Sequence, residues 1–186
     1  EVILYDGNTS LNPDTIKNQI GEGTKAEVIL GALSEEVMKT LEFVVMSPGV
    51  PTDLPVVNQM REMGIPIWGE IELAYTYGKG DVLAITGTNG KTTTTALLGE
   101  IMKNFKESVY VVGNIGNPYT TEALHMTNES IAVAEVSSFQ LETIHNFRPR
   151  VSAILNITPD HLDRHHTMEA YIAAKEDVAK NQTKED

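Results

Sequence analysis

The stretch Val82-Leu-Ala-Ile85-Thr86-Gly87-Thr88-Asn89-Gly90-Lys91-Thr92-Thr93 decides the fold. The apolar residues 82–85 predict a buried strand, and a helix is predicted from Lys91 to Asn104. The glycine-rich loop between them therefore joins a strand to the N-terminus of a helix. Such a loop directs backbone N–H groups at an anion, Lys91 can neutralise phosphates, and the Thr92 hydroxyl can reach Mg²⁺. Ile85 stands where the strict phosphate-loop pattern has glycine, so the stretch is a variant. The alternative is a glycine-rich turn with a solvated lysine.

Apolar runs alternate with helical patterns along the rest of the chain, which predicts an α/β protein with parallel sheets. We expect two Rossmann-like units, residues 1–78 and 79–186, joined by a linker at 77–81, the second being a phosphate-loop nucleotide-binding domain. The chain has no initiator Met and begins inside a predicted strand, so we expect a fragment. The other predicted strands are Val2–Tyr5, Glu27–Leu30, Phe43–Met46, Ile65–Trp68, Val109–Val112, Ile131–Val136 and Val151–Asn156, and the other predicted helices are Asp14–Ile20, Pro55–Met63 and Thr167–Lys180.

Composition excludes several classes of function. The 186 residues are 41% hydrophobic, which argues against disorder, and carry 26 Asp+Glu against 14 Lys+Arg, for a net charge of −12. That balance disfavours nucleic-acid binding, so an anionic ligand must be held by local cations, backbone N–H groups or metal ions. The absence of cysteine excludes disulfides, thiolate metal sites and cysteine nucleophiles. No apolar run reaches the length of a membrane span, so we expect no membrane partner.

Glu135 interrupts the apolar strand predicted at 131–136. A buried carboxylate is costly unless it is paired or bound to a cation, and in nucleotide-binding sheets such a residue commonly serves Mg²⁺. The alternative is an edge-strand glutamate that faces water.

The segment 158–166 is dense in residue types that bind metals, namely Asp160, His161, Asp163, His165 and His166. It follows a predicted strand, where the binding loops of open α/β sheets gather. One imidazole and one or two carboxylates could hold a divalent ion, whereas the histidines match no standard zinc spacing. The alternative is a solvated turn.

Three further features carry weaker signals. Lys175, taken alone, has the pattern of a surface lysine on a helix. Asp6 follows the first strand and could hydrogen-bond a ribose or base, or form a turn. The Ser47-Pro48-Gly49 turn could cradle a phosphate or simply reverse the chain.

Together these segments resemble the Mur ligases, the ATP-dependent amino-acid ligases of peptidoglycan precursor synthesis. The phosphate loop is also similar to that of the folylpolyglutamate synthases, while Glu135–Glu142 is most similar to the D-glutamate-adding branch. The resemblance covers nearly all of the chain. Its segments are Thr86–Thr93, Gly113–Gly116, Glu135–Glu142, Asn156–Asp163, Tyr171–Lys175, Ser47–Val50 and Gly69–Leu73.

The resemblance implies a role for each matched position. Lys91, Glu135, His161 and Lys175 would be catalytic. Thr92 and Glu135 would bind a first Mg²⁺, and His161 with a CO₂-modified (carbamylated) Lys175 would bind a second. The positions implied to bind ATP are Gly87, Thr88, Asn89, Gly90, Lys91, Thr92 and Thr93, and those implied to bind the other substrate are Asp6, Ser47, Pro48, Gly49, Asn114 and Ser137.

The implied activity is ligation of D-glutamate to UDP-N-acetylmuramoyl-L-alanine with ATP, in the cytoplasm and by a monomer. Both units would be incomplete: the first strand of the UDP-substrate-binding domain, part of the ATPase domain and a C-terminal domain would be missing. We therefore expect these residues alone to be inactive. The alternatives are another Mur ligase, a folylpolyglutamate synthase-like ligase or, for these residues alone, a non-catalytic nucleotide-binding module.

Overall fold

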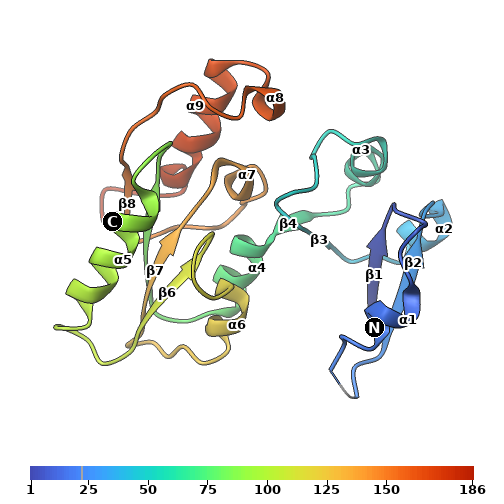
Figure 1. Ribbon diagram of the computed structural model, residues 1–186, viewed down its shortest axis with the longest axis horizontal. Helices are drawn as coiled ribbons and strands as arrows, with labels where there is room; N and C mark the ends of the chain where they lie inside the picture. Colours follow the sequence, from blue (N-terminus) through green and yellow to red (C-terminus); the bar gives the residue numbers. More distant parts are fainter. Residues whose placement is uncertain (22) are drawn as a thin grey trace. The chain divides into compact units, whose positions relative to one another are not determined.

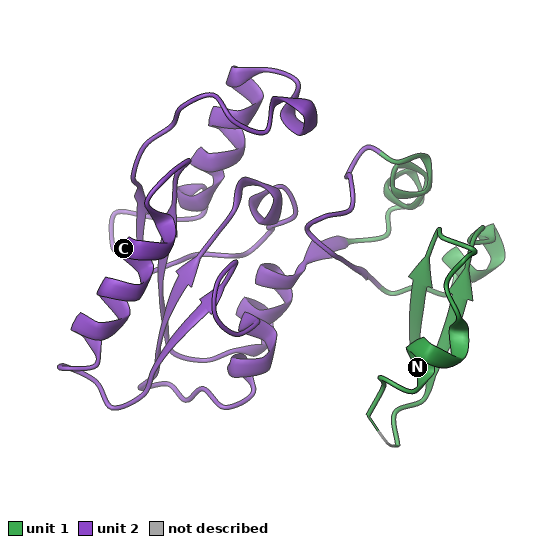
Figure 2. Cartoon of the chain, in the orientation of Figure 1, with its two compact units in different colours: residues 1–42, 54–66 green, residues 43–53, 67–186 purple. Residues whose placement is uncertain are grey.

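Parallel strand pairing confirms the predicted α/β class. The computed structural model describes residues 1–21 and 23–186, whose strands form three parallel sheets, β1-β2, β3-β4 and β6-β7-β5-β8 (Figure 1). These residues divide into two units that do not follow chain order (Figure 2). The first comprises residues 1–42 and 54–66, and the second comprises residues 43–53 and 67–186.

The first unit contains one strand pair and short helices with clear start signals. Asn12 begins α1 by accepting a hydrogen bond from the Asp14 backbone N–H, and Ser34 begins α2 in the same way with Val37. Pro55 occupies the first turn of α3, where its missing N–H costs nothing. The elements are β1 (Val2–Asp6), α1 (Pro13–Lys17), β2 (Ala26–Leu30), α2 (Glu35–Met38) and α3 (Pro55–Glu62).

The second unit is built on the four-stranded sheet. Its register aligns Ile85 on β5 with Glu135 on β7, and Glu135 with Gly113 on β6, so the loops after these strands emerge at one edge. The elements are β3 (Val44–Met46), β4 (Ile67–Gly69), α4 (Glu70–Tyr77), β5 (Asp81–Thr86), α5 (Lys91–Met102), β6 (Val109–Gly113), α6 (Tyr119–Ala123), β7 (Ile131–Glu135), α7 (Ser138–Leu141), β8 (Val151–Ile154), α8 (Leu162–His165), α9 (Met168–Glu176) and a 3₁₀ turn (Asp177–Ala179).

Helices cover both faces of this sheet. A Cβ on Gly99 of α5 would collide with Val111 of β6, so α5 lies directly against that face. The next residue, Val112, points to the opposite face, where it is fully buried in one cluster with residues of α4 and α6. Figure 1 shows these two helices on the other side of the sheet from α5. Within residues 1–21 and 23–186, no helix combines the length and the apolar character needed to cross a membrane.

The four strands of residues 1–78 pair as β1-β2 and β3-β4. The β3-β4 pair belongs to the second unit because backbone and side-chain contacts tie it to the segment after α7. Gly69 N–H donates to the Thr143 carbonyl (3.3 Å), and His145 Nε2 lies 2.8 Å from the Ile67 carbonyl oxygen. The last helix ends at Glu176 rather than Lys180, and α2, α4, α6, α7 and α8 were not predicted. The domain boundary between residues 78 and 79 stays a prediction.

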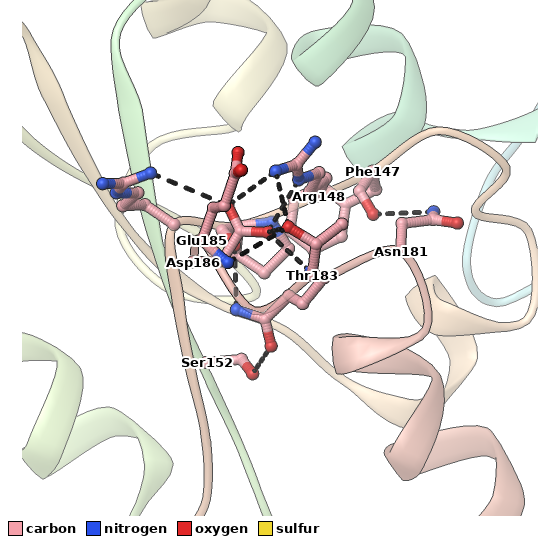
Figure 3. Close-up of polar contacts among 10 residues, drawn as sticks. Phe147, Arg148, Ser152, Asn181, Thr183, Glu185 and Asp186 are labelled. Atoms are coloured by element: carbon pink, nitrogen blue, oxygen red, sulfur yellow. Dashed lines mark hydrogen bonds and ion pairs between the residues drawn. The ribbon is translucent and has the colours of Figure 1, made fainter.

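The segment after α9 is anchored to the chain that leads into β8 (Figure 3). Arg148 donates two hydrogen bonds to the Asp186 carboxylate, from Nε (2.8 Å) and from one terminal nitrogen (3.1 Å). The Arg148 guanidinium lowers the pKa of Asp186 to about 2. The Asn181 amide donates to the Phe147 carbonyl at 2.9 Å. These contacts hold residues 181–186 near the amino-terminal end of β8.

Glu72 of α4 is a fully buried carboxylate that organises the loop after α7. It accepts hydrogen bonds from three successive backbone N–H groups, those of His145 (2.9 Å), Asn146 (2.8 Å) and Phe147 (3.0 Å). A buried charge is tolerated when donors of this kind surround it. Glu72 therefore fixes the loop that in turn holds β4.

We expect Glu72→Gln to lower the free energy of unfolding by about 2–3 kcal/mol, because the amide places an N–H₂ group against backbone donors. Urea denaturation followed by the fluorescence of Trp68, the only tryptophan, measures the change. Glu100→Gln on the exposed face of α5 is the control and should change stability by less than about 0.5 kcal/mol. Equal effects of the two substitutions would contradict the role given to Glu72.

Candidate active site

The phosphate loop joins β5 to α5, as predicted, and is held by the chain that follows β8. Gly90, the N-cap of α5, has φ 83°, a left-handed conformation that glycine adopts readily. Asn156 forms paired hydrogen bonds with the backbone of Asn89, accepting from its N–H and donating to its carbonyl, both at 2.9 Å. Thr88 Oγ1 donates to the Thr158 carbonyl (3.1 Å) and accepts from the Thr158 N–H (3.0 Å). The loop is thus preformed.

Lys91 folds back over this loop. Its Nζ donates to the carbonyl oxygens of Gly87 (2.9 Å) and Thr88 (3.0 Å), and the side chain is part-buried. This geometry excludes the alternative of a freely solvated lysine. It keeps a cation at the helix N-terminus, where the backbone N–H groups also favour an anion.

Glu135 ends β7, a strand with neighbours on both sides, and its side chain is 1% exposed. The water-facing, edge-strand alternative is therefore wrong. The Thr92 hydroxyl donates to Glu135 Oε2 (2.8 Å) and the Asn114 amide donates to Oε1 (2.9 Å). The first turn of α5, the loop after β6 and the end of β7 thus meet at one carboxylate. The Thr92 hydroxyl and the Glu135 carboxylate supply oxygen ligands, the type that Mg²⁺ prefers, so these two residues fit such an ion.

An open cavity of about 350 Å³ lies beside this carboxylate. Its volume is in the range of small-molecule binding sites. Lys91 and Lys175 supply positive charge to its wall. The lining residues are Pro48, Gly49, Lys91, Asn114, Ser137, Ser138, Phe139, His161, Tyr171 and Lys175.

Lys175 is buried, with 2% of its surface exposed, so the surface-helix alternative is wrong. Its Nζ donates to the Gly87 carbonyl (2.9 Å) and lies 4.7 Å from the centre of the Tyr171 ring. Burial, reinforced by the nearby Lys91 ammonium, lowers the pKa of Lys175 to about 8. A substantial fraction of this amine is therefore neutral near physiological pH.

The histidines of segment 158–166 differ in their surroundings. His161 is half exposed, has a left-handed backbone (φ 51°, ψ 32°) and stacks obliquely on Phe139. His165 is buried, with Nε2 3.0 Å from Ser138 Oγ and Nδ1 3.4 Å from Glu142 Oε1, and burial lowers its pKa. His166 is exposed. No group of three or more His, Asp or Glu side chains suited to a metal occurs in the described part of the chain, so nothing there supports zinc.

Comparison with known proteins agrees with this geometry. Residues 85–186, more than half of the chain, match the Mur ligase middle domain. The chain belongs to the Mur ligase family. Residues 6–69 match the N-terminal domain of MurD-like Mur ligases. The family resemblance inferred from the sequence motifs is therefore confirmed.

Two curated Mur ligases are similar over all 186 residues. The UDP-N-acetylmuramoylalanine–D-glutamate ligases of Lachnoclostridium phytofermentans and Lachnospira eligens are 60% and 57% identical to this chain. The chain spans 41% of the length of each. A crystal structure of UDP-N-acetylmuramate:L-alanyl-γ-D-glutamyl-meso-diaminopimelate ligase from Neisseria meningitides has a TM-score of 0.54 at 17% identity. The match covers 98% of this chain and 61% of that one, and it shows a shared fold.

The structure brings most of the predicted Mur ligase residues together in the second unit. Ser47 lies outside the cavity lining, and its carbonyl accepts from Val50 N–H in a turn. Asp6 belongs to the first unit, where its carboxylate accepts from the Asn8 N–H at 2.8 Å, the turn that was its alternative. The cavity-lining residues that were not predicted are Ser138, Phe139 and Tyr171.

These three residues could have been predicted from their position, because each lies in a segment that resembles the Mur ligases. Ser138 and Phe139 directly follow Ser137, and Tyr171 begins the Lys175 segment. Tyr171 is 1% exposed, and its hydroxyl lies 3.1 Å from Thr88 Oγ1. It therefore joins α9 to the phosphate loop.

The lowered pKa of Lys175 predicts how stability depends on pH. Above about pH 8 the folded state loses the proton, whereas the unfolded chain keeps it until about 10.5. The wild type should therefore gain up to about 3 kcal/mol over Lys175→Met as pH rises from 8 to 10.5. Urea denaturation in CO₂-free buffer measures this difference, and a difference independent of pH would contradict the burial argument.

Proposed function

We propose that the full-length protein is an ATP-dependent ligase that joins D-glutamate to UDP-N-acetylmuramoyl-L-alanine, a step of peptidoglycan synthesis that serves cell-wall growth, cell shape and division. The observation that carries the proposal is one cavity at the carboxyl edge of the sheet that is lined by Lys91, Lys175 and Asn114, the last of which donates to the Glu135 carboxylate that Thr92 also contacts. The names of the similar ligases support the choice of substrates.

A carboxylate is a poor electrophile, so the reaction needs activation. A carboxylate oxygen of the sugar-peptide attacks the γ-phosphorus of ATP, the bond to the β-phosphate oxygen breaks, and an acyl phosphate and ADP form. The D-glutamate amine then attacks the acyl carbon, phosphate leaves, and the amine loses a proton. Both ATP and the carboxylate are anions, so Lys91 and the loop N–H groups would offset their repulsion.

Mg²⁺ would add Lewis-acid stabilisation of the phosphate charge when bound. Thr92 and Glu135 would hold a first ion. His161 and Lys175, which line the same cavity, would hold a second, and Lys175 would do so in its carbamylated form because an ammonium repels a cation. CO₂ reacts with neutral amines, and a pKa of about 8 leaves roughly a quarter of Lys175 neutral at pH 7.5, against about a thousandth at the ordinary pKa.

Several finer expectations stay predictions. They are the cytoplasmic location, the monomeric state and the contribution of Asp6, Ser47, Pro48, Gly49, Asn114 and Ser137 to binding of the uridine nucleotide substrate. A location in the cytoplasm is consistent with the use of ATP and a nucleotide-linked sugar.

The direct test is a turnover assay of the full-length protein with ATP and UDP-N-acetylmuramoyl-L-alanine, comparing D-glutamate with other amino acids. We expect phosphate release with D-glutamate. In Lys91→Ala, acyl-phosphate formation should fall by at least about 10³-fold with the fold intact, since the two Nζ hydrogen bonds that are lost both go to carbonyls of its own loop. Nucleotide binding without ligation in the wild type would favour a binding module, and near-normal turnover in Lys91→Ala would remove its assigned role.

The carbamylation proposal has its own test. Lys175→Ala in the full-length protein should lose most activity and recover part of it when acetate or another short carboxylate supplies the missing oxygen ligand. Lys180→Ala, a lysine whose Nζ donates to the Ile144 carbonyl away from the cavity, is the matched control. Activity of Lys175→Ala at the wild-type level would refute a ligand role.

A further inference from the structure

Arg164 of α8 joins three segments of the second unit through one guanidinium group. It donates to the Glu142 carboxylate next to α7 (2.7 Å), and the same nitrogen donates to the carbonyl of Val50 (3.0 Å). Its Cζ lies 5.0 Å from the centre of the Phe139 ring. The side chains of Arg164 and Glu142 are only 13% and 16% exposed, so water screens their interaction weakly.

The three joined segments supply part of the cavity wall. Pro48 and Gly49 precede the held Val50 carbonyl, Phe139 belongs to α7, and His161 begins α8. Arg164 itself is not among the lining residues. It lies behind this wall and connects its parts.

Two other lining residues, Lys91 and Asn114, have separate supports. Lys91 is held by loop carbonyls, and Asn114 is held by Glu135. Neither contact involves Arg164. Lys91 can therefore keep its position in the phosphate loop when residue 164 changes.

The contacts of Arg164 need a planar, forked cation. A guanidinium can hydrogen-bond a carboxylate and a carbonyl while stacking on a ring, whereas a lysine ammonium is a compact point charge. Arg164→Lys therefore keeps the charge and removes the bridging geometry.

We propose that Arg164 is a positioning residue that holds the 48–50 turn against α7 and thereby sets affinity for the uridine nucleotide substrate, leaving the ATP site unaffected. This inference rests on the proposed function.

The contacts of His165 with Ser138 and Glu142 resemble a catalytic triad, but the geometry argues against Ser138 as a nucleophile. Ser138 is 2% exposed, and Glu142 is already engaged by Arg164.

The test compares Arg164→Lys with wild type in the full-length enzyme. The KM for UDP-N-acetylmuramoyl-L-alanine should rise about 10- to 100-fold, the range expected for losing a charge-assisted hydrogen bond, while the KM for ATP stays within about twofold. Arg148→Lys is the matched control, because Arg148 also pairs with a carboxylate but does so near the amino-terminal end of β8 (Figure 3). It should leave both KM values unchanged.

The proposal would be overturned if Arg164→Lys raised both KM values equally or raised neither of them. Loss of ADP binding by Arg164→Lys would also overturn it. Hydrogen exchange without substrate separates this inference from the proposed function. In Arg164→Lys, the amides of residues 47–53 should exchange at least about tenfold faster, while those of α5 keep their rates. If the wild-type protein showed no ligation in the turnover assay, the proposed function would be refuted but the role of Arg164 would not. If hydrogen exchange at residues 47–53 were unchanged in Arg164→Lys, the role of Arg164 would be refuted.

Discussion

The carbonyl oxygen of Gly87 accepts hydrogen bonds from two lysine ammonium groups, those of Lys91 and Lys175. The phosphate loop, α9 and the chain after β8 together hold these groups in place. Two like charges held together, one of them almost fully buried, are unfavourable unless dipoles and an incoming anion offset them. The loop carbonyls provide the dipoles. In a chain of net charge −12, this local concentration of positive charge defines where an anion can bind.

The two buried carboxylates Glu135 and Glu72 are stabilised by different kinds of hydrogen-bond donor. Glu135 accepts from two side chains, one in the first turn of α5 and one in the loop after β6, which suits the proposed exchange of these partners for a cation. Glu72 is surrounded by backbone N–H groups, which suits a permanent support. The chemistry of the donors thus separates the proposed metal ligand Glu135 from the structural carboxylate Glu72, although both are buried to nearly the same degree.

Local patterns predicted the phosphate loop and the burial of Glu135, since strand periodicity, glycine spacing and apolar flanks are all short-range signals. The burial of Lys175 could not be predicted in this way, because its partner Gly87 lies 88 residues earlier. Helices α7 and α8 have four residues each, too few to show a helical period. The contact of His165 with Ser138 depends on how these two short helices meet, and sequence spacing carries no signal for it.

The left-handed backbone of His161 has an evolutionary consequence. A non-glycine residue in this conformation costs about 1 kcal/mol or more, which glycine would avoid and asparagine would reduce. Selection for stability alone would therefore favour glycine at position 161, whereas selection for an imidazole facing the cavity would retain histidine. Under the proposed metal-binding role of His161, thermostability and activity compete at this position, so consensus-style stabilisation of this protein should leave it untouched.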